Sequence, residues 1–225
     1  RDEGYFNFAR LCNAGVRHAA GDMIVLLNND TTVQTDGWLE AMVGLAQQPS
    51  VGAVGCKLLY PDGSIQHAGV VGLADVIAGH AAKGRNADDR GYIHMASTVH
   101  EVLAVTAACL MVRRELFRSV GGLDEQWVPN AYGDVDFCLR LRGAGYRNVF
   151  TPYAVLTHHE SPTRGLNIEN FERIYMRQRW GEELLNDPYL NPNLGRNESY
   201  AIDRRFVLPE MPSSFFARML ARQDS

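Results

Sequence analysis

Several common signatures are missing from this sequence of 225 residues, and each absence excludes a class of function. The glycine-rich motifs GxGxxG and GxxxxGK[ST] do not occur, which removes the usual signs of dinucleotide-binding and P-loop proteins. GxSxG and HExxH are also absent, so the sequence indicates neither a nucleophile elbow nor a zinc protease. There is no polybasic run and the formal net charge is −4, which argues against a nucleic-acid-binding surface.

Cysteine is sparse, and its four copies, Cys12, Cys56, Cys109 and Cys138, lie far apart among apolar neighbours. Without a CxxC pair they are expected to be free thiols in a reducing compartment, with no disulfides and no structural zinc. The apolar runs are strand-sized, too short for a membrane-spanning helix, and no signal peptide is visible. We therefore expect a cytoplasmic protein. Because the chain opens on Arg1 and not on Met, we read it as a fragment of a longer protein and leave an anchor elsewhere open.

The order of apolar patterns along the chain predicts an α/β fold. Helical spacing over residues 6–20 precedes a continuous apolar run over 23–27, which is typical of a strand buried on both faces in a parallel sheet. The further elements that we expect are a helix capped by Asp36 with its buried stripe over 38–46, strands over 51–60 and 102–112, a strand and a long loop over 65–90, helices over 115–120 and 135–142, one or two strands over 149–156, and a helix over 167–185. This order indicates a mixed, mostly parallel sheet flanked by helices. We expect a core over residues 1–165 and a C-terminal helical extension and tail over 166–225.

The segment Ile24–Thr32, IVLLNNDTT, places two amides and a carboxylate where a buried strand ends. In an open α/β sheet, ligands bind beyond the carboxyl ends of the strands. Mg²⁺ and Mn²⁺ prefer oxygen ligands, so Asp30 is a candidate metal-binding carboxylate, with Asn28 or Asn29 beside a ribose or a water. An Asx turn that leads towards the next helix explains the same tripeptide equally well.

A second candidate is the segment GDVDFCLR. On a helix that starts near Asp134, the spacing i, i+4, i+7 puts Asp134, Cys138 and Leu141 on the inward face. Asp136 faces elsewhere and stands four residues before Arg140, so we expect these two side chains to form an exposed, structural ion pair. Asp134 is either the N-terminal cap of the helix or a carboxylate that faces a cleft and acts as a general base.

The third candidate is the segment TPYAVLTHHES, in which two histidines follow a short strand. Neighbouring strand residues face opposite ways, so either His158 or His159, but not both, can face a given site. Imidazole is a common metal ligand that suits Mn²⁺ better than Mg²⁺. An ordinary surface or packing histidine is the alternative.

Together these segments resemble the family 2 glycosyltransferases of the GT-A fold. The resemblance covers most of the chain and is carried by FNFARLCNAGVRHAAGDMIVLLNNDTTV, WLEAMV, VGAVGCKLLYPDGSIQHAGVV, VTAACLMVRRELFRSVGGLDE, GDVDFCLRLRGAGYRNVFTPYAVLTHHES and DPYLNPNL. Several motifs in the right order are more specific than any one of them. The middle segments are similar to bacterial members that build polysaccharides of the cell envelope.

Position by position, the resemblance implies a set of roles. Asp30 becomes the carboxylate whose metal, Mn²⁺ or Mg²⁺, grips the diphosphate of the sugar nucleotide, and Asn28 and Asn29 replace an earlier acidic position of that motif. Asp134 becomes the base that deprotonates the acceptor hydroxyl. His158 matches the metal-side histidine better than its neighbour does.

Three further positions matter to this comparison. Arg10 and Asn13 match positions near the nucleotide. Gly133 stands where the family often has an acidic residue, which leaves the base in place and removes a neighbour that could tune its pKa.

The implied reaction is inverting transfer of a sugar from a nucleotide-diphosphate donor to a glycan or lipid-linked acceptor hydroxyl, in the cytoplasm or at the inner face of the membrane. The family begins with a strand and a nucleotide-binding turn that this chain lacks. We therefore expect the strand over 23–27 to have lost a neighbour and the chain to bind donor poorly. A nucleotidyltransferase on a related sheet and a non-catalytic glycosyltransferase-like partner are the alternatives.

Overall fold

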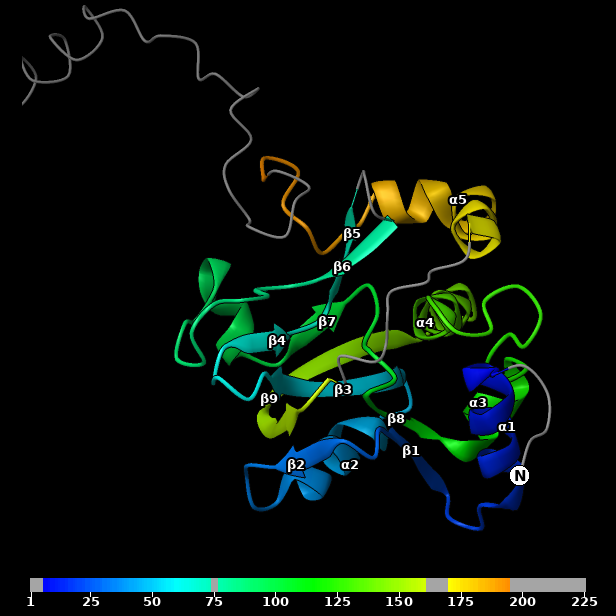
Figure 1. Cartoon of the computed structure of the whole chain (residues 1–225), viewed down its shortest axis with the longest axis horizontal. Coiled ribbons are helices and arrows are strands. Elements are labelled where there is room, and N and C mark those ends of the chain that lie inside the picture. The colour runs from blue at the N-terminus through cyan, green and yellow to red at the C-terminus, as the bar shows by residue number, and fades with distance from the viewer. Residues whose placement is uncertain (1–5, 74–76, 161–169, 195–225) are drawn as a thin grey trace, which may run out of the picture.

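The computed structural model describes residues 6–73, 77–160 and 170–194, which form a mixed α/β structure (Figure 1). The elements in chain order are α1 (Phe8–His18), β1 (Met23–Leu27), β2 (Thr31–Val33), α2 (Trp38–Ala46), β3 (Val51–Leu59), β4 (Ile65–His67), β5 (Val70–Leu73), β6 (Ile77–His80), the 3₁₀ segment η1 (Tyr92–Ser97), β7 (His100–Val102), β8 (Cys109–Arg113), α3 (Arg114–Ser119), α4 (Gly133–Gly143), β9 (Arg147–His158) and α5 (Asn170–Leu185).

The main sheet has the strand order β1-β8-β3-β9-β2, with β4 paired to β3 and β7 paired to β9, while β5 and β6 form a separate hairpin. The expected α/β class is confirmed, but the expectation of a mostly parallel sheet is wrong. Within the described residues, β3 and β9 are the parallel pair and all other pairs are antiparallel. The continuous apolar runs led to the wrong strand direction. A central antiparallel strand that is covered on both faces has the same continuous apolar sequence as a parallel one.

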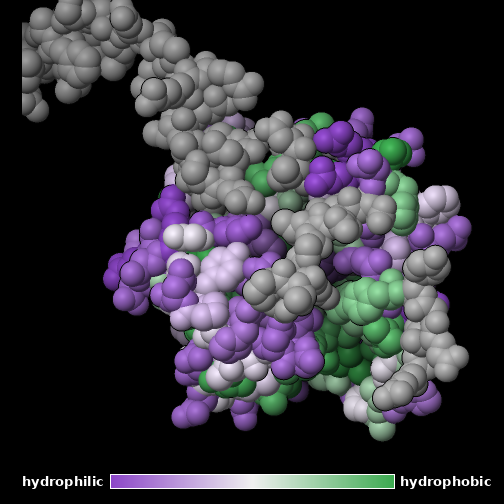
Figure 2. Space-filling model, viewed as in Figure 1, coloured by the Kyte–Doolittle hydropathy of each residue, from purple (hydrophilic) through white to green (hydrophobic). Residues whose placement is uncertain are grey.

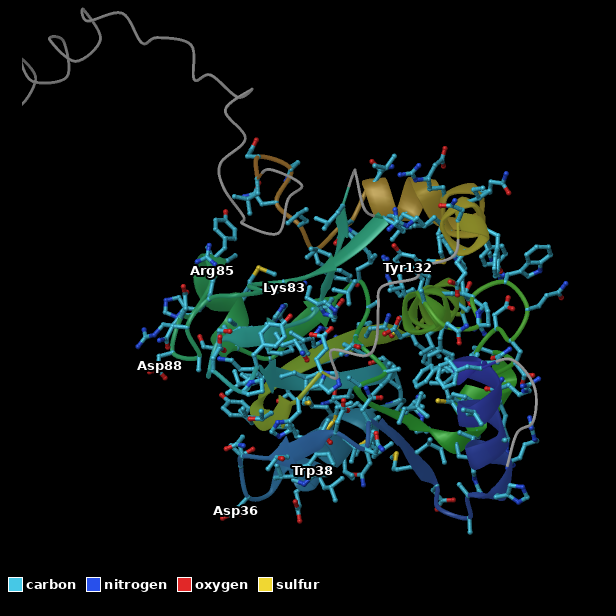
Figure 3. All side chains as sticks on the ribbon, in the orientation of Figure 1. Asp36, Trp38, Lys83, Arg85, Asp88 and Tyr132 are labelled. Carbon is cyan, nitrogen blue, oxygen red and sulfur yellow. The ribbon has the colours of Figure 1, made fainter. Side chains whose placement is uncertain are left out.

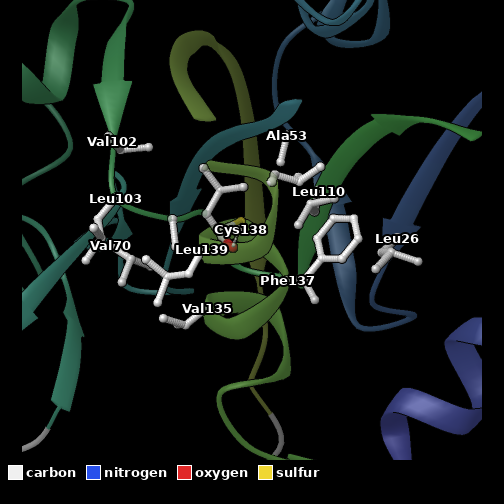
Figure 4. Close-up of a cluster of buried hydrophobic side chains, with 14 of the residues drawn as sticks. Leu26, Ala53, Val70, Val102, Leu103, Leu110, Val135, Phe137, Cys138 and Leu139 are labelled. Carbon is white, nitrogen blue, oxygen red and sulfur yellow. Dashed lines mark hydrogen bonds between the residues drawn. The ribbon is translucent and has the colours of Figure 1, made fainter. Parts of the chain in front are cut away.

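Both faces of the central strands are indeed buried. On one face α2 packs Met42 and Ala46 against Val54, in a cluster that continues through β8 and β9. On the other face α4 packs Phe137 and Leu141 in a cluster with β3 and β8, part of which Figure 4 shows around Leu26, Ala53, Leu110 and Phe137. The face of the molecule in Figure 2 is mostly hydrophilic, with a hydrophobic area beside β8 and β1.

Several expected boundaries differ in the structure. The run 102–112 is divided between β7 and β8, because the chain leaves the sheet between them. The stretch 65–90 holds three strands and not one. β9 continues through Pro152. Its register with β3 shifts there, between Cys56 and Lys57, and such an irregularity can accommodate a proline, which has no N–H to donate. α2 begins after Gly37, which has a φ of 72° and is the N-cap, so Asp36, on the outer loop in Figure 3, is not the cap.

α5 packs against β5, β6 and α4 (Figure 1). The backbones approach closely at Gly72, where a Cβ atom would lie 1.8 Å from the carbonyl oxygen of Leu184. Asp187, just after α5, accepts a hydrogen bond of 3.1 Å from the Gly72 amide. The proposed boundary near residue 165 lies outside the described residues, so the two-part division stays a prediction.

Two other expectations concern the edge of the sheet and the thiols. β1 pairs with β8, and no other described strand pairs with it, so the loss of a neighbour stays a prediction. All four cysteines are free, as expected, and three of them are buried. Among the described helices, none is both long and apolar enough to cross a membrane.

Candidate active site

The turn from β1 to β2 carries Asn28, Asn29 and Asp30, and pairing with two distant segments holds it in place. The backbone amide of Asn28 donates to the Ala108 carbonyl oxygen at 3.0 Å. β2 then pairs with the end of β9, with Thr31 opposite His158, and the His159 amide donates to the Asp30 carbonyl oxygen at 2.8 Å. This register brings the end of β9 beside a turn that lies some 130 residues earlier in the chain.

Three of the predicted side chains meet at this turn. Nε2 of His158 lies 3.2 Å from Oδ1 of Asp30 and 3.0 Å from Nδ2 of Asn28. The side chain of His158 is 9% exposed and that of Asp30 is 33% exposed. Solvent therefore reaches the Asp30 carboxylate, while the His158 imidazole is almost fully covered. Asn29 is exposed and belongs to the same turn.

His158 and His159 face opposite ways, as expected for neighbouring strand residues. Nε2 of His159 lies 3.0 Å from Oγ1 of Thr32 on the exposed side of β2, whereas His158 is buried against Asp30. Of the two imidazoles, the one that meets the carboxylate is His158.

The Asp30–His158 pair fits a hard divalent cation. Oδ1 of Asp30 is buried and has no hydrogen-bond partner among the described residues. Adjacent ligands of an octahedral ion such as Mg²⁺ stand about 3 Å apart, close to the observed 3.2 Å between Oδ1 and Nε2. No group of three or more His, Cys, Asp or Glu in the described part of the chain could hold a metal, so such an ion would keep positions for water and substrate oxygens.

Asp134 lies in the first turn of α4 but is not its cap. The N-cap is Tyr132, with a φ of 59° and no side-chain cap hydrogen bond, at the entrance to α4 (Figure 3). The carboxylate of Asp134 accepts from the Ala107 amide at 3.0 Å and from the Val135 amide at 2.9 Å. The residue after Ala107 is Ala108, whose carbonyl holds the Asn28 turn. A single stretch of backbone between β7 and β8 therefore links Asp134 to the Asp30–His158 pair.

Asp136 is not the exposed ion-pair member that we expected; its side chain is fully buried. It accepts from Nε of Arg140 and from the indole Nε1 of Trp180, each at 2.8 Å, and Arg179 stands 3.8 Å away. The helical spacing to Arg140 was correct, but α5 covers the pair, and that contact is invisible in the local pattern.

Arg10 and Asn13 belong to α1, which lies beside α3 and away from β2 in Figure 1. Asn13 is buried, and its amide donates to the Leu123 carbonyl oxygen at 2.8 Å and to Glu125 at 2.9 Å and accepts from the Leu123 amide at 2.9 Å. It lines a shallow hollow of about 420 Å³ with residues 121–125, Arg140 and Arg179. The structure does not bring this residue to Asp30, so its nucleotide role stays a prediction.

One residue at the site was not identified from the sequence. Oε1 of Gln66, in β4, lies 2.7 Å from Nδ1 of His158, and the Gln66 side chain is buried. The only local signal is a polar Gln-His pair inside the apolar stretch SIQHAGVV.

The next residue, His67, is expected to make the stability of the fold depend on pH. His67 is fully buried, with its Nδ1 2.7 Å from Nδ1 of His80. Burial lowers the pKa of the His67 imidazole well below its ordinary 6.5, and the neighbouring His80 adds to this. As the pH falls below about 6.5, the unfolded chain binds a proton that native His67 resists, so the free energy of unfolding should fall by up to about 1.4 kcal/mol per pH unit.

Urea unfolding between neutral pH and the acid limit of the folded state checks this expectation. His67→Leu should have a shallower dependence of unfolding free energy on pH than the wild type. The substitution removes a proton that the unfolded chain binds and that the native protein, with His67 buried, does not. His18→Gln, at an exposed site, is the control and should keep the wild-type slope. Equal slopes in wild type and His67→Leu would show that His67 does not resist protonation.

Comparison with known proteins agrees with the resemblance. Residues 23–188 match the family described as "Glycosyl transferase family group 2". The uncharacterized protein y4gI of Sinorhizobium fredii is 45% identical over 86% of this chain and 22% of its own length. The O-antigen biosynthesis protein RfbC of Myxococcus xanthus is 38% identical over 84% of this chain and 15% of its own length. The chain thus spans less than a quarter of these two relatives.

A solved structure supports the fold independently. GalNAc-T7 with UDP, GalNAc and Mn²⁺ is similar over 83% of this chain and 37% of that chain, with a TM-score of 0.61 and 12% identity. At that identity the likeness shows the fold alone, and it confirms the expected glycosyltransferase type of α/β structure. Since the family match extends over more than half of the residues, the chain belongs to glycosyl transferase family group 2.

Proposed function

We propose that this chain is the core of an inverting, metal-dependent glycosyltransferase that moves a sugar from a nucleotide-diphosphate donor to an acceptor hydroxyl. The observation that carries the proposal is the contact of 3.2 Å between Asp30 and His158, with Asp134 joined to the same turn through Ala107 and Ala108. Sugar transfer needs positive charge for the leaving diphosphate and a base for the attacking hydroxyl. In this proposal Asp30 and His158 would hold a metal that supplies the charge, and Asp134 would be the base.

Asp30 and His158 are the residues that would hold Mn²⁺ or Mg²⁺. When bound, the ion supplies positive charge that stabilises the departing diphosphate. The imidazole ligand favours Mn²⁺ over Mg²⁺. The presence of Mn²⁺ with UDP in the GalNAc-T7 structure, which has a similar fold, supports a divalent cation in this proposal by analogy.

Asp134 is the proposed base. Amides hold both of its oxygens, Ala107 on one and Val135 on the other, so the carboxylate is oriented before substrate arrives. Each carboxylate oxygen keeps a further lone pair that can accept a proton. The acceptor hydroxyl gives its proton to Asp134 as the hydroxyl oxygen forms a bond to the anomeric carbon. The bond from that carbon to the diphosphate oxygen breaks, and the diphosphate leaves with the electron pair.

The acceptor that we propose is a saccharide or a lipid-linked saccharide. The support is the 38% identity to a protein named for O-antigen biosynthesis. Incubation with a panel of UDP-, GDP- and dTDP-sugars, with and without saccharide acceptors, tests the proposal through release of nucleoside diphosphate. Metal-independent release, or none with any donor, would contradict it.

The metal assignment can be checked by exchanging each of the two neighbouring histidines. His158→Gln should weaken Mn²⁺ binding in the presence of UDP by at least the roughly 10- to 100-fold that loss of an outer-shell partner costs, because it removes a direct ligand. His159→Gln should bind Mn²⁺ like the wild type, since His159 contacts Thr32 on the exposed side. Electron paramagnetic resonance of free Mn²⁺ measures both affinities, and the opposite ranking would refute the assignment.

A further inference from the structure

The imidazole of His158 is held at both nitrogens. Nδ1 lies 2.7 Å from Oε1 of Gln66, while Nε2 faces Asn28 and Asp30 at 3.0 and 3.2 Å. Gln66 reaches the ring across β3, because His67 in β4 and Leu156 in β9 both pair with Leu58 in β3. Gln66 as a whole residue is 5% exposed, so water does not compete readily for the contact.

The orientation of the Gln66 amide follows from its other neighbour. Nε2 of Gln66 lies 3.3 Å from Oε2 of Glu160, and an ionised carboxylate can only accept a hydrogen bond. The NH₂ group of Gln66 therefore points to Glu160, and its carbonyl oxygen points to His158. Since a carbonyl oxygen can only accept, Nδ1 of His158 must carry a proton.

A neutral imidazole with its proton on Nδ1 has a lone pair on Nε2. Asn28 donates to that lone pair, so a cation that binds Nε2 would take the place of this hydrogen bond. Oδ1 of Asp30, which has no hydrogen-bond partner among the described residues, lies 3.2 Å from Nε2. Two electron-rich atoms 3.2 Å apart repel each other unless a cation lies between them. In the other tautomer, an Nε2–H group would replace that lone pair, face the NH₂ group of Asn28 and block metal binding.

We infer that Gln66 is a positioning residue that holds His158 in the Nδ1–H tautomer and so keeps Nε2 ready to bind a divalent cation. The hydrogen bond at one imidazole nitrogen decides which nitrogen is protonated, and outer-shell partners of this kind orient metal ligands. The inference rests on the proposed function for the presence of a metal. The tautomer itself is a property of the chain and can be measured without one.

The first measurement is ¹⁵N NMR of the metal-free protein at about pH 8, above the ordinary imidazole pKa. The His158 signals are assigned by comparison with His158→Gln. Wild type should show a protonated, pyrrole-type Nδ1 and a lone-pair-bearing, pyridine-type Nε2. In Gln66→Met the side chain has a similar length but lacks the carbonyl oxygen and offers only a weak sulfur acceptor, so the His158 ring should populate both tautomers.

The second measurement is the affinity for Mn²⁺. Gln66→Met should bind Mn²⁺ about 10- to 100-fold more weakly than the wild type, the usual cost of losing an outer-shell partner. The double variant Gln66→Glu with Glu160→Gln restores an acceptor next to Nδ1 and a donor beside it, and should recover both the tautomer and the affinity. Gln34→Met is the matched control, since Gln34 is exposed and donates to Thr157, the residue before His158, at 3.0 Å.

The outcomes separate the two proposals. An Nε2–H or doubly protonated ring in the wild type, or a wild-type tautomer and Mn²⁺ affinity in Gln66→Met, would overturn the role of Gln66. If the double variant folds but recovers neither property, the role is likewise overturned. A wild type with the Nδ1–H tautomer and no affinity for Mn²⁺ would support the role of Gln66 in setting the His158 tautomer and would contradict metal-dependent transfer.

Discussion

Asp134→Asn should lower the turnover number by about 10²- to 10⁴-fold while leaving donor and metal binding unchanged, the usual cost of losing a general base. The amide is the same size as the carboxylate, and its oxygen can still accept from the Ala107 amide. It loses the capacity to take a proton from the acceptor hydroxyl and also the hydrogen bond from the Val135 amide, because its NH₂ group cannot accept. Single-turnover release of nucleoside diphosphate, with nucleotide affinity measured separately, distinguishes lost chemistry from lost binding.

Asp36→Asn serves as the control for this experiment, because Asp36 is exposed on the loop before α2, away from α4 (Figures 1 and 3). It should turn over like the wild type. A wild-type rate in Asp134→Asn would exclude this residue as the base, whereas no turnover in the wild type itself would favour a non-catalytic partner. Loss of donor binding in the same variant would mean that Asp134 holds substrate and not the proton.

Asp136→Ala should lower the free energy of unfolding by about 3–5 kcal/mol, because it removes one partner of a buried ion pair. The side chain is fully buried, and its loss leaves the guanidinium of Arg140, 15% exposed, without its carboxylate. It also leaves the indole N–H of Trp180 without the 2.8 Å hydrogen bond that joins α5 to α4. Urea unfolding measures the effect.

Arg179→Gln is the matched comparison, since it weakens a contact to the same carboxylate from the solvent side. Arg179 is 40% exposed and stands 3.8 Å from Asp136, so its loss should cost no more than about 1 kcal/mol. Asp136→Asn, which keeps the shape and the Trp180 contact, should fall between the two. If Asp136→Ala were no less stable than Arg179→Gln, the buried network would not stabilise the packing of α5.

The elements that the sequence predicted well are those with a strong local pattern. β1 has the expected bounds, Met23–Leu27, and the helix over 135–142 is present within α4. These patterns depend on periods of a few residues, so nearby side chains are enough to reveal them. The chemical candidates Asp30 and His158 were likewise visible because polar residues followed apolar runs.

Long-range pairing decided the rest. The direction of the strands, the division between β7 and β8, and the burial of Asp136 under α5 all depend on segments far apart in the chain. Gln66 belongs to this group too, since it lies 92 residues from His158 and no local period relates the two.

The amino-acid sequence by itself determined the class of the fold, most of its local elements and the residue types at the candidate site. Only the tertiary structure decided that His158 and not His159 meets Asp30. The period of two in a strand predicts that adjacent side chains point to opposite faces of the sheet, but it does not predict which of them faces inward. That choice was made by the register of β2 on β9, where Thr31 pairs with His158, a contact formed by packing across more than a hundred residues.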